Sequence, residues 1–334
     1  MSLLQVSGLS KEYKGRLSLA QRLTGAKETV VRAVSDVSLH VNKGEVLGLI
    51  GESGCGKSTL GRAILRLHEP TAGKVVFDGA DVTALPPAEL KAMRRRMQII
   101  FQDPYASLNP RRTVAEIVGL PLSLHGIAHG DEARAITARV LERVGLRAGQ
   151  IDRYPHQFSG GQRQRIGIAR ALVSNPEFIV CDEPVSALDV SIQAQIIALL
   201  LELKRELGLT YLFISHDISV IGYLSDRVAV MYLGEIVETG PVAAVLDHPR
   251  HPYTQSLLSA VPEIGAKRAK GRVRLQGDLP SPLNPPKGCK FHTRCPLAIP
   301  VCQTRAPENQ SVGAGHVAAC HRLDENLSLL DGAP

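Results

Sequence analysis

A glycine-rich segment that follows an apolar run constrains the fold of this chain more than any other feature. The run Val46–Ile50 is followed by the letters GESGCGKS at Gly51–Ser58 and by a helix-like stretch through Leu67. A strand, a glycine loop and a helix in this order are typical of a phosphate-binding loop. Glycines let backbone N–H groups surround phosphate oxygens, and the helix start adds roughly half a positive charge.

Each residue type in this loop has a chemical reason to be there. Lys57 is expected to reach the β and γ phosphates and Ser58 to ligate Mg²⁺, whereas Cys55 is expected to be a small filler and not a nucleophile. The candidate nucleotide contacts of the segment are Gly51, Ser53, Gly54, Cys55, Gly56, Lys57, Ser58 and Thr59.

Length and composition favour a soluble globular protein. The 334 residues fit roughly two domains, and apolar runs such as Ile196–Leu201 are too short to cross a bilayer. The segment Met1–Val6 lacks the basic and apolar stretches of a secretion signal, so a cytosolic location is expected.

The formal net charge is +7, but the basic clusters 94–96 and 267–274 lack interleaved aromatic residues. They are interpreted as a solvated helix face and a linker, and no nucleic-acid partner is expected.

Alternating strand and helix patterns predict an α/β fold. Residues 4–82 read as strand-rich, with runs at Val34–Val41 and 74–77, and helical periodicity dominates 85–172. Apolar strands return at Phe178–Cys181 and Tyr211–Ile214. Strands separated by helices predict a largely parallel sheet, whose ligands bind beyond the carboxyl ends of the strands.

Two acidic residues end the predicted strand Phe178–Cys181. Asp182 is expected to hold the hydration shell of Mg²⁺ and Glu183 to orient and deprotonate the attacking water, although an acidic turn before Pro184 is an equal alternative. An ordinary glutamate has a pKa of about 4.3, so Glu183 needs raised basicity or a late proton transfer. The sequence leaves both possibilities open.

Two further segments could face phosphate. The residues Ser159, Gly160, Gly161 and Gln162 precede a helical run ending at Leu172. This is either a second anion-ready helix start or an ordinary capped helix. His216 follows the strand Tyr211–Ile214, where a histidine is more often structural than catalytic.

Taken together, these motifs resemble the ATP-binding cassette (ABC) ATPases over residues 1–262. The resemblance implies a P-loop NTPase fold with a mixed-sheet lobe and a helical subdomain at about 103–175. It implies that Ser159–Gln162 completes the nucleotide site of a partner subunit and that Asp189 lies in the dimer loop. Tyr13 is implied to stack on adenine and His216 to contact the γ phosphate. The implied magnesium contacts are Ser58, Gln102 and Asp182, and the implied catalytic residues are Glu183, His216 and Gln102.

Three longer strings narrow the resemblance to the ATPases of dipeptide and oligopeptide importers. They lie at Gln102–Pro110, His248–Thr254 and Pro280–Pro286, and the second ATPase subunit of bacterial dipeptide permeases is the nearest type. The resemblance implies a heterodimer with a paralogous ATPase at the cytoplasmic face of the inner membrane. It further implies two membrane permease subunits, docked near 102–110, and an extracytoplasmic solute-binding protein. ATP hydrolysis would drive import. The alternative is a soluble ABC ATPase that acts on nucleic acid. The resemblance leaves the cargo open among dipeptides, oligopeptides, nickel, heme and glutathione.

Four cysteines are concentrated near the end of the chain. A composition change after Pro262 predicts a small C-terminal domain at 263–334. Its cysteines are separated by five, six and seventeen residues, and zinc sites prefer closer pairs. The spacing and the resemblance favour a [4Fe-4S] cluster, with Zn²⁺ or buried reduced thiols as alternatives. The predicted ligands are Cys289, Cys295, Cys302 and Cys320.

Overall fold

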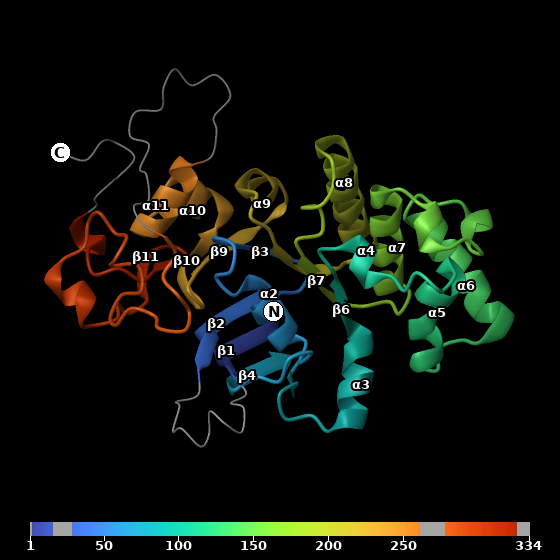
Figure 1. Ribbon diagram of the computed structural model, residues 1–334, viewed down its shortest axis with the longest axis horizontal. Coiled ribbons are helices and arrows are strands. Elements are labelled where there is room, and N and C mark those ends of the chain that lie inside the picture. The colour runs from blue at the N-terminus through green and yellow to red at the C-terminus, as the bar shows by residue number, and fades with distance from the viewer. Residues whose placement is uncertain (1, 16–28, 261–277, 326–334) are drawn as a thin grey trace. The chain divides into compact units, whose positions relative to one another are not determined.

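The computed structural model describes residues 2–15, 29–260 and 278–325, and its contacts divide the chain into two units (Figure 1). Unit 1 comprises Met1–Leu4, His40–Val46 and Val76–Ser215, and unit 2 comprises Gln5–Leu39, Leu47–Val75 and His216–Pro334. The predicted boundary at 262 and the basic run 267–274 lie outside the described residues.

Unit 1 is built on three parallel strands in the order β8-β7-β6. Their bounds are β6 Met97–Ile100, β7 Phe178–Asp182 and β8 Thr210–Ile214. Every residue of β7 and β8 is buried, which explains why both strands read as continuous apolar runs. Both strands were predicted, but β6 was missed inside a region expected to be helical.

Helices make up much of the rest of unit 1. Within the predicted helical subdomain, α5 packs against both α6 and α7. A capping box between Thr113 and Glu116 begins α5, and Gly208 in a left-handed conformation ends α8. None of the helices in the described ranges has both the length and the apolar character needed to cross a bilayer. The bounds are α3 Pro87–Arg96, α4 Pro104–Ser107, α5 Val114–Leu124, α6 Gly130–Arg143, α7 Gly160–Leu172, α8 Val190–Leu207 and the 3₁₀ turns Ala148–Gln150 and Pro155–Gln157.

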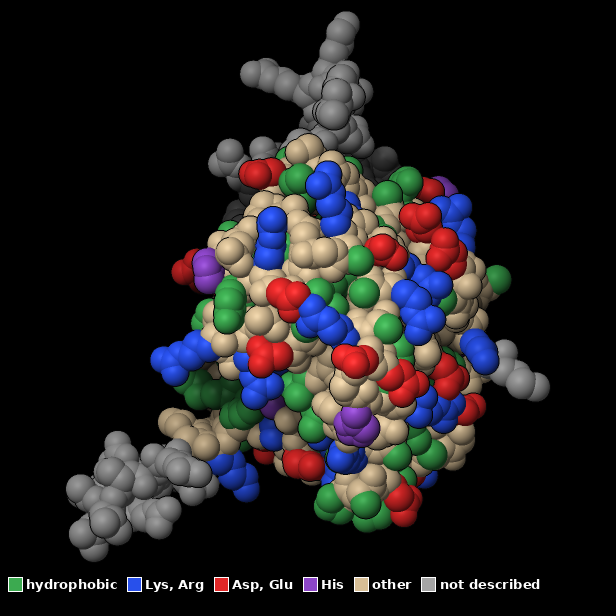
Figure 2. Space-filling model, turned by 90° about the vertical axis from the view of Figure 1, so that its right-hand side faces the viewer, with side chains coloured by type: hydrophobic (Ala, Val, Ile, Leu, Met, Phe, Trp, Pro, Cys, Tyr) green, Lys and Arg blue, Asp and Glu red, His purple; other side chains and the backbone are tan. Residues whose placement is uncertain are grey.

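The basic cluster 94–96 of unit 1 lies at the end of α3. In the cluster 94–96, Arg96 forms ion pairs with both Asp78 and Glu177. On the face drawn in Figure 2, lysine and arginine side chains are interspersed with aspartate and glutamate. The positive net charge is therefore not gathered into a stripe on this face.

Unit 2 combines one parallel pair with an antiparallel extension in the order β11-β12-β10-β9-β3. A tight turn at Leu233 and Gly234, both with positive φ, joins β9 to β10. A second sheet has the strand order β2-β1-β4-β5, in which β5 and the last two residues of β4, which pair with each other, belong to unit 1. The strand bounds are β1 Ser2–Lys14, β2 Val30–Asn42, β3 Val46–Ile50, β4 Ala72–Phe77, β5 Ala80–Asp81, β9 Arg227–Tyr232, β10 Glu235–Pro241, β11 Gln310–Gly313 and β12 His316–Ala318. The helices are α2 Lys57–Ile64, α9 Ile218–Leu224, α10 Val242–Asp247 and α11 Pro252–Ser259, with 3₁₀ turns at Pro300–Gln303 and Leu323–Glu325.

The structure does not support a separate cysteine-containing C-terminal domain. Strand β12 pairs with β10, so C-terminal residues extend the sheet that also contains β9 and β3. The buried carboxylate of Glu238 on β10 lies 2.7 Å from His316 Nε2 and accepts hydrogen bonds from the backbone N–H groups of Arg250 and His251. Because a buried carboxylate needs such partners, β12 and the 250–251 turn are fixed to the same strand.

Candidate functional site

The glycine loop of unit 2 begins where the fully buried strand β3 ends. Gly51, Gly54 and Gly56 have φ values of 153°, 79° and 110°, which side chains rarely adopt. A Cβ atom on Gly51 would lie 2.2 Å from the backbone oxygen of Met231, and one on Gly56 would lie 2.1 Å from that of Ala33. The loop therefore needs glycine because its backbone lies directly against β9 and β2.

Lys57 and the start of α2 complete the loop. Lys57 is 4% exposed, and its ammonium donates hydrogen bonds to the backbone oxygens of Gly51 at 2.8 Å and Glu52 at 3.0 Å. No side chain of the described residues caps the N-terminus of α2. Uncapped N–H groups and a positive helix end suit an anion. Burial raises the pKa of the Cys55 thiol, which fits a small filler that stays protonated.

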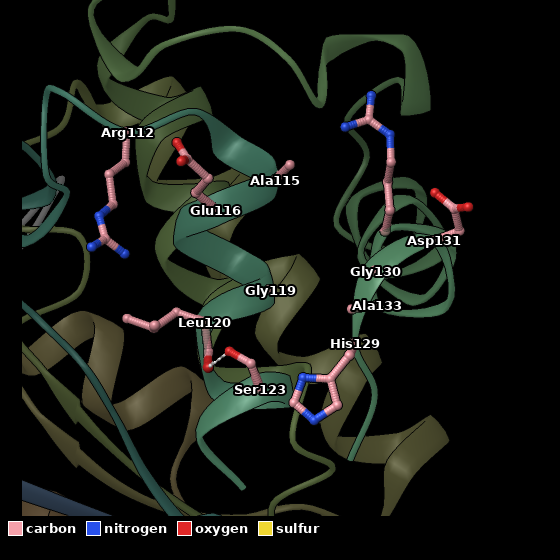
Figure 3. A pocket seen from close by; sticks show the side chains of 11 residues that line it. Arg112, Ala115, Glu116, Gly119, Leu120, Ser123, His129, Gly130, Asp131 and Ala133 are labelled. Carbon is pink, nitrogen blue, oxygen red and sulfur yellow. Dashed lines mark hydrogen bonds between the residues drawn. The ribbon is translucent and has the colours of Figure 1, made fainter. Parts of the chain in front are cut away.

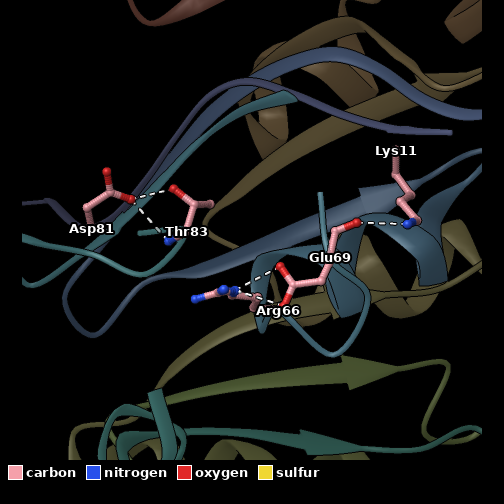
Figure 4. A network of polar contacts seen from close by, with 5 residues as sticks. All are labelled: Lys11, Arg66, Glu69, Asp81 and Thr83. Carbon is pink, nitrogen blue, oxygen red and sulfur yellow. Dashed lines mark hydrogen bonds and ion pairs between the residues drawn. The ribbon is translucent and has the colours of Figure 1, made fainter. Parts of the chain in front are cut away.

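Tyr13 on β1 lies among polar side chains of the same unit. Its hydroxyl is 2.6 Å from Nδ1 of His68, and the two rings meet edge to face. Burial and nearby cations lower the pKa of His68, so the neutral ring can accept the phenolic proton. Lys11 lies over the tyrosine ring and donates to the backbone oxygen of Glu69, whose carboxylate accepts from Arg66 (Figure 4).

The acidic pair of unit 1 lies at the carboxyl end of β7, as predicted. Asp182 is 1% exposed, and Glu183 has a φ of 46°, which is unusual for a residue with a side chain. The N–H of Glu183 donates to the backbone oxygen of Ile214 at 3.1 Å, which holds this conformation. Gln102 donates its amide to Glu183 Oε2 at 3.0 Å, so the structure brings these two predicted residues together.

The segment Ser159–Gln162 starts α7 with a capping box. The Ser159 hydroxyl accepts from the N–H of Gln162, whose side-chain oxygen accepts from the N–H of Ser159. The structure thus shows a capped helix whose N-cap residue, Ser159, is exposed. A Cβ on Gly161 would lie 2.5 Å from Ile192 Cγ2, so glycine allows α7 to approach α8 closely. Asp189 is exposed at the N-terminus of α8.

His216 is exposed and follows the buried strand β8. The next residue, Asp217, caps α9 by accepting from two backbone N–H groups, and this fixes the turn that carries His216. Unit 2 carries Tyr13, the predicted loop residues from Gly51 to Thr59, and His216. Unit 1 carries Gln102, Ser159, Gly160, Gly161, Gln162, Asp182, Glu183 and Asp189.

Comparison with known proteins decides the family. The sequence model of the ABC transporter family matches residues 34–186. A second family model, described as the C-terminal region of oligopeptide/dipeptide transporters, matches residues 237–302. The oligopeptide transport ATP-binding protein AppF of Bacillus subtilis is 51% identical over 96% of this chain and 97% of its own length. This chain belongs to the ABC ATPases of oligopeptide and dipeptide transporters.

Other relatives agree with this membership. A putative peptide import ATP-binding protein of Brucella ovis is 52% identical over 96% of this chain and 98% of its own length. The solved dimer of the ATP-binding cassette MJ0796 bound to ADP and Pi is 32% identical, with a TM-score of 0.62 over 72% of this chain and 98% of that chain. The predicted ABC ATPase fold is therefore confirmed.

A hollow of about 480 Å³ lies between α5 and α6 of this ABC ATPase (Figure 3). Its lining mixes charged side chains such as Arg112 and Asp131 with Leu120 and Gly119. None of the predicted nucleotide contacts lines it. The hollow is therefore separate from the residues assigned to ATP.

The four C-terminal cysteines of the ABC ATPase are free, and opposing effects act on the pKa values of three of them. Backbone N–H groups two residues ahead act on the sulfurs of Cys289, Cys295 and Cys320 and lower their pKa values. Burial outweighs this effect and raises the pKa of Cys289 to about 11 and that of Cys295 to about 12. Within the described ranges, no group of three or more metal-ligating side chains could hold a metal ion. The predicted [4Fe-4S] cluster and its zinc alternative are thus unsupported by the described side chains.

Two residues that the sequence analysis did not assign contact the phosphate loop of the ABC ATPase. The hydroxyl of Tyr253 accepts from the N–H of Glu52 at 2.9 Å, and the guanidinium of Arg294 binds the Glu52 carboxylate. Tyr253 lies in His248–Thr254, one of the three strings that carry the resemblance to peptide-importer ATPases. Both residues lie about 200 or more positions from the loop, and no local spacing indicates such a contact.

The close backbone contacts of the glycine loop predict the effect of adding one methyl group. Gly56→Ala places a Cβ 2.1 Å from the backbone oxygen of Ala33 at a φ of 110°. We expect MgATP to bind at least about tenfold more weakly, measured by calorimetry on the full chain. Gly126→Ala is the matched control, because Gly126 also has a positive φ but no described atom lies within 4 Å of its Cβ position. If Gly56→Ala binds MgATP with wild-type affinity, the loop does not need glycine at this position and the assignment is contradicted.

Proposed function

We propose that this ABC ATPase hydrolyses ATP to ADP and phosphate to drive peptide import through membrane permease subunits. The near full-length match to AppF carries the proposal, since it spans both the cassette and the C-terminal region. The names of these relatives refer to oligopeptide transport and peptide import. The loop geometry adds the physical reason, because an uncapped helix start behind three positive-φ glycines suits a triphosphate.

Within unit 2, we assign the triphosphate to the glycine loop. Backbone N–H groups of Ser53–Cys55 and of the α2 start would surround the phosphates, and Lys57 would exchange its backbone oxygens for phosphate oxygens. Thr59 would add a hydroxyl contact in the first turn of α2. Tyr13 would stack on adenine, and the exposed His216 would contact the γ phosphate.

Within unit 1, we assign the hydrolytic water to Glu183. The bond from Gln102 holds the Glu183 carboxylate in one orientation, and the backbone bond to Ile214 holds its main chain. An oriented carboxylate can accept a proton from water as the γ phosphoryl group departs. In this unit the side-chain oxygens of Gln102 and Asp182 suit Mg²⁺, and in unit 2 the Ser58 hydroxyl does so as well. Mg²⁺, when bound, would neutralise phosphate charge.

Completion of the site by a second ATPase subunit is supported by the exposed helix start at Ser159. The solved relative MJ0796 is described as a dimer with ADP and Pi. We propose that Ser159–Gln162 binds the nucleotide held by a paralogous subunit, with Asp189 at the interface. The two subunits would form a heterodimer that ATP closes and hydrolysis reopens.

Permease docking is assigned to the segment Gln102–Pro110. Tyr105 is 57% exposed and lies under the Arg163 guanidinium, 4.1 Å from the ring centroid. Arg170 donates to the backbone oxygen of Ser107, so both ends of α4 are fixed to α7, the helix that begins at Ser159–Gln162. A permease contact here would act on α7 directly. We place the chain at the cytoplasmic face of the membrane, receiving cargo through permeases from an extracytoplasmic solute-binding protein.

The substitution Glu183→Gln tests the catalytic assignment. The amide keeps the shape of the side chain but cannot take a proton, so MgATP binding should persist while turnover falls by at least about 100-fold. Steady-state phosphate release and MgATP calorimetry measure the two effects separately. Glu206→Gln, on the exposed side of α8, is the matched control and should leave both unchanged. Undiminished hydrolysis by Glu183→Gln would remove Glu183 from this role.

We further propose that the four C-terminal cysteines hold a [4Fe-4S] cluster. Backbone N–H groups at three of the sulfurs would stabilise thiolates once a metal compensates the burial that raises their pKa values. The N–H of Cys289 donates to the backbone oxygen of Cys302 at 2.8 Å, which keeps these two segments adjacent. A bound cluster would supply the positive charge that compensates several neighbouring thiolates. This donor chemistry supports the proposal although the described side chains form no metal-binding group.

Metal analysis tests the cluster directly. Protein purified without oxygen should contain about four iron and four sulfide per chain, measured by colorimetric assay and absorbance near 400 nm. Cys295→Ser should lose the iron, whereas Cys181→Ala, which changes a cysteine buried in β7, should retain it. Stoichiometric zinc without sulfide, or no metal at all, would contradict the cluster.

A further inference from the structure

The phosphate loop of unit 2 carries a carboxylate that is held from the C-terminal part of the chain. Arg294 donates two hydrogen bonds to Glu52, from Nη1 to Oε2 at 2.7 Å and from Nη2 to Oε1 at 3.0 Å. The Arg294 side chain is 7% exposed and that of Glu52 is 25% exposed. A two-pronged charged pair with this little solvent is among the stronger and more specific polar contacts in proteins.

The backbone of Glu52 is held by the same region. Its N–H donates to the hydroxyl of Tyr253, which is fully buried. The Tyr253 ring packs against Tyr232 and Phe291, with ring centroids 4.6 Å and 5.4 Å away. Phe291 precedes Arg294 by three residues, and the N–H of Arg294 donates to its backbone oxygen. One aromatic cluster therefore positions both contacts to Glu52.

The turn that carries Arg294 is fixed to the β9–β10 hairpin. Lys290 donates to the backbone oxygen of Leu233 at 2.9 Å and forms an ion pair with Glu235. The hairpin in turn holds the phosphate loop, because the N–H of Gly234 donates to the backbone oxygen of Cys55 at 2.8 Å. Arg294 and the loop thus share one rigid support.

The charge of this pair matters for the ligand. A triphosphate must approach a loop that carries a carboxylate at its second position, and like charges at short range repel strongly where water is scarce. Arg294 balances that charge and holds both carboxylate oxygens of Glu52. Without Arg294, Glu52 would be free to repel the phosphates or to capture Lys57.

We propose that Arg294 is a positioning residue of the nucleotide site, which neutralises and holds Glu52 so that the loop can accept ATP. The C-terminal region is then a working part of the nucleotide site. This inference rests on the proposed role of the loop in ATP binding. If Arg294 only attached the C-terminal region, its removal would lower stability and leave ATP affinity unchanged.

Binding measurements on the full chain separate these roles. In the hydrolysis-deficient Glu183→Gln background, Arg294→Met keeps an apolar stem of similar length but removes the charge. We expect MgATP to bind about tenfold more weakly, measured by calorimetry at low salt. Adding Glu52→Gln to Arg294→Met removes the unpaired charge and should restore affinity to within about threefold of the Glu183→Gln parent. Arg305→Met is the matched control, because Arg305 forms an exposed pair with Glu308 and should leave affinity unchanged.

Two outcomes would overturn the inference. Parent affinity in Arg294→Met shows that Arg294 does not act on the nucleotide site, and weak binding that Glu52→Gln fails to rescue shows that the charge of Glu52 is not the cause. If Arg294→Met does not fold, Arg294→Lys replaces it, because lysine keeps the positive charge but loses the two-pronged guanidinium contact to Glu52. MgATP affinity should then fall about threefold, and unchanged affinity would again contradict the inference. Failure of the Glu183→Gln parent to bind MgATP would contradict the proposed function and not this inference.

Discussion

The close approach of backbone to backbone around the glycine loop is the constraint on which the nucleotide site depends. Gly51 lies against Met231 on β9 and Gly56 against Ala33 on β2, with no room for a Cβ atom. Gly51 and Gly56 have positive φ angles at this contact, and the α2 start that follows has no side-chain cap in the described structure. The same strand β9 leads into the hairpin whose Gly234 holds Cys55. The loop is therefore shaped by the sheet and not by its own sequence alone.

Support from the C-terminal region extends this constraint. Strand β12 joins β10, the buried Glu238 fixes the 250–251 turn, and that turn leads to Tyr253. Tyr253 and Arg294 then hold the backbone and the side chain of Glu52. These polar contacts thus link the C-terminal region to Glu52, the residue that follows Gly51. This explains in physical terms why the C-terminal residues belong to the same unit as the loop.

The sequence predicted the elements that depend on local pattern. The loop residues, the buried strand β7 with Asp182 at its end and the helix start at Ser159 follow from adjacent residues. It missed β6, because four residues after a strongly helical stretch carry too little periodic signal. It also missed β12 and the Arg294 contact, because pairings over many residues leave no mark on local composition. The pairing of β12 with β10 is also why the structure does not support a separate C-terminal domain.

Amide hydrogen exchange with and without MgATP tests the central claim most directly, because the claim places the nucleotide on the backbone of one loop. Exchange should be measured by mass spectrometry on the wild-type chain. The account predicts that MgATP slows exchange at residues 52–58 by at least about tenfold, while residues 115–134 around the α5–α6 hollow stay unchanged. Unchanged exchange at the loop, or protection confined to the hollow, would contradict the account.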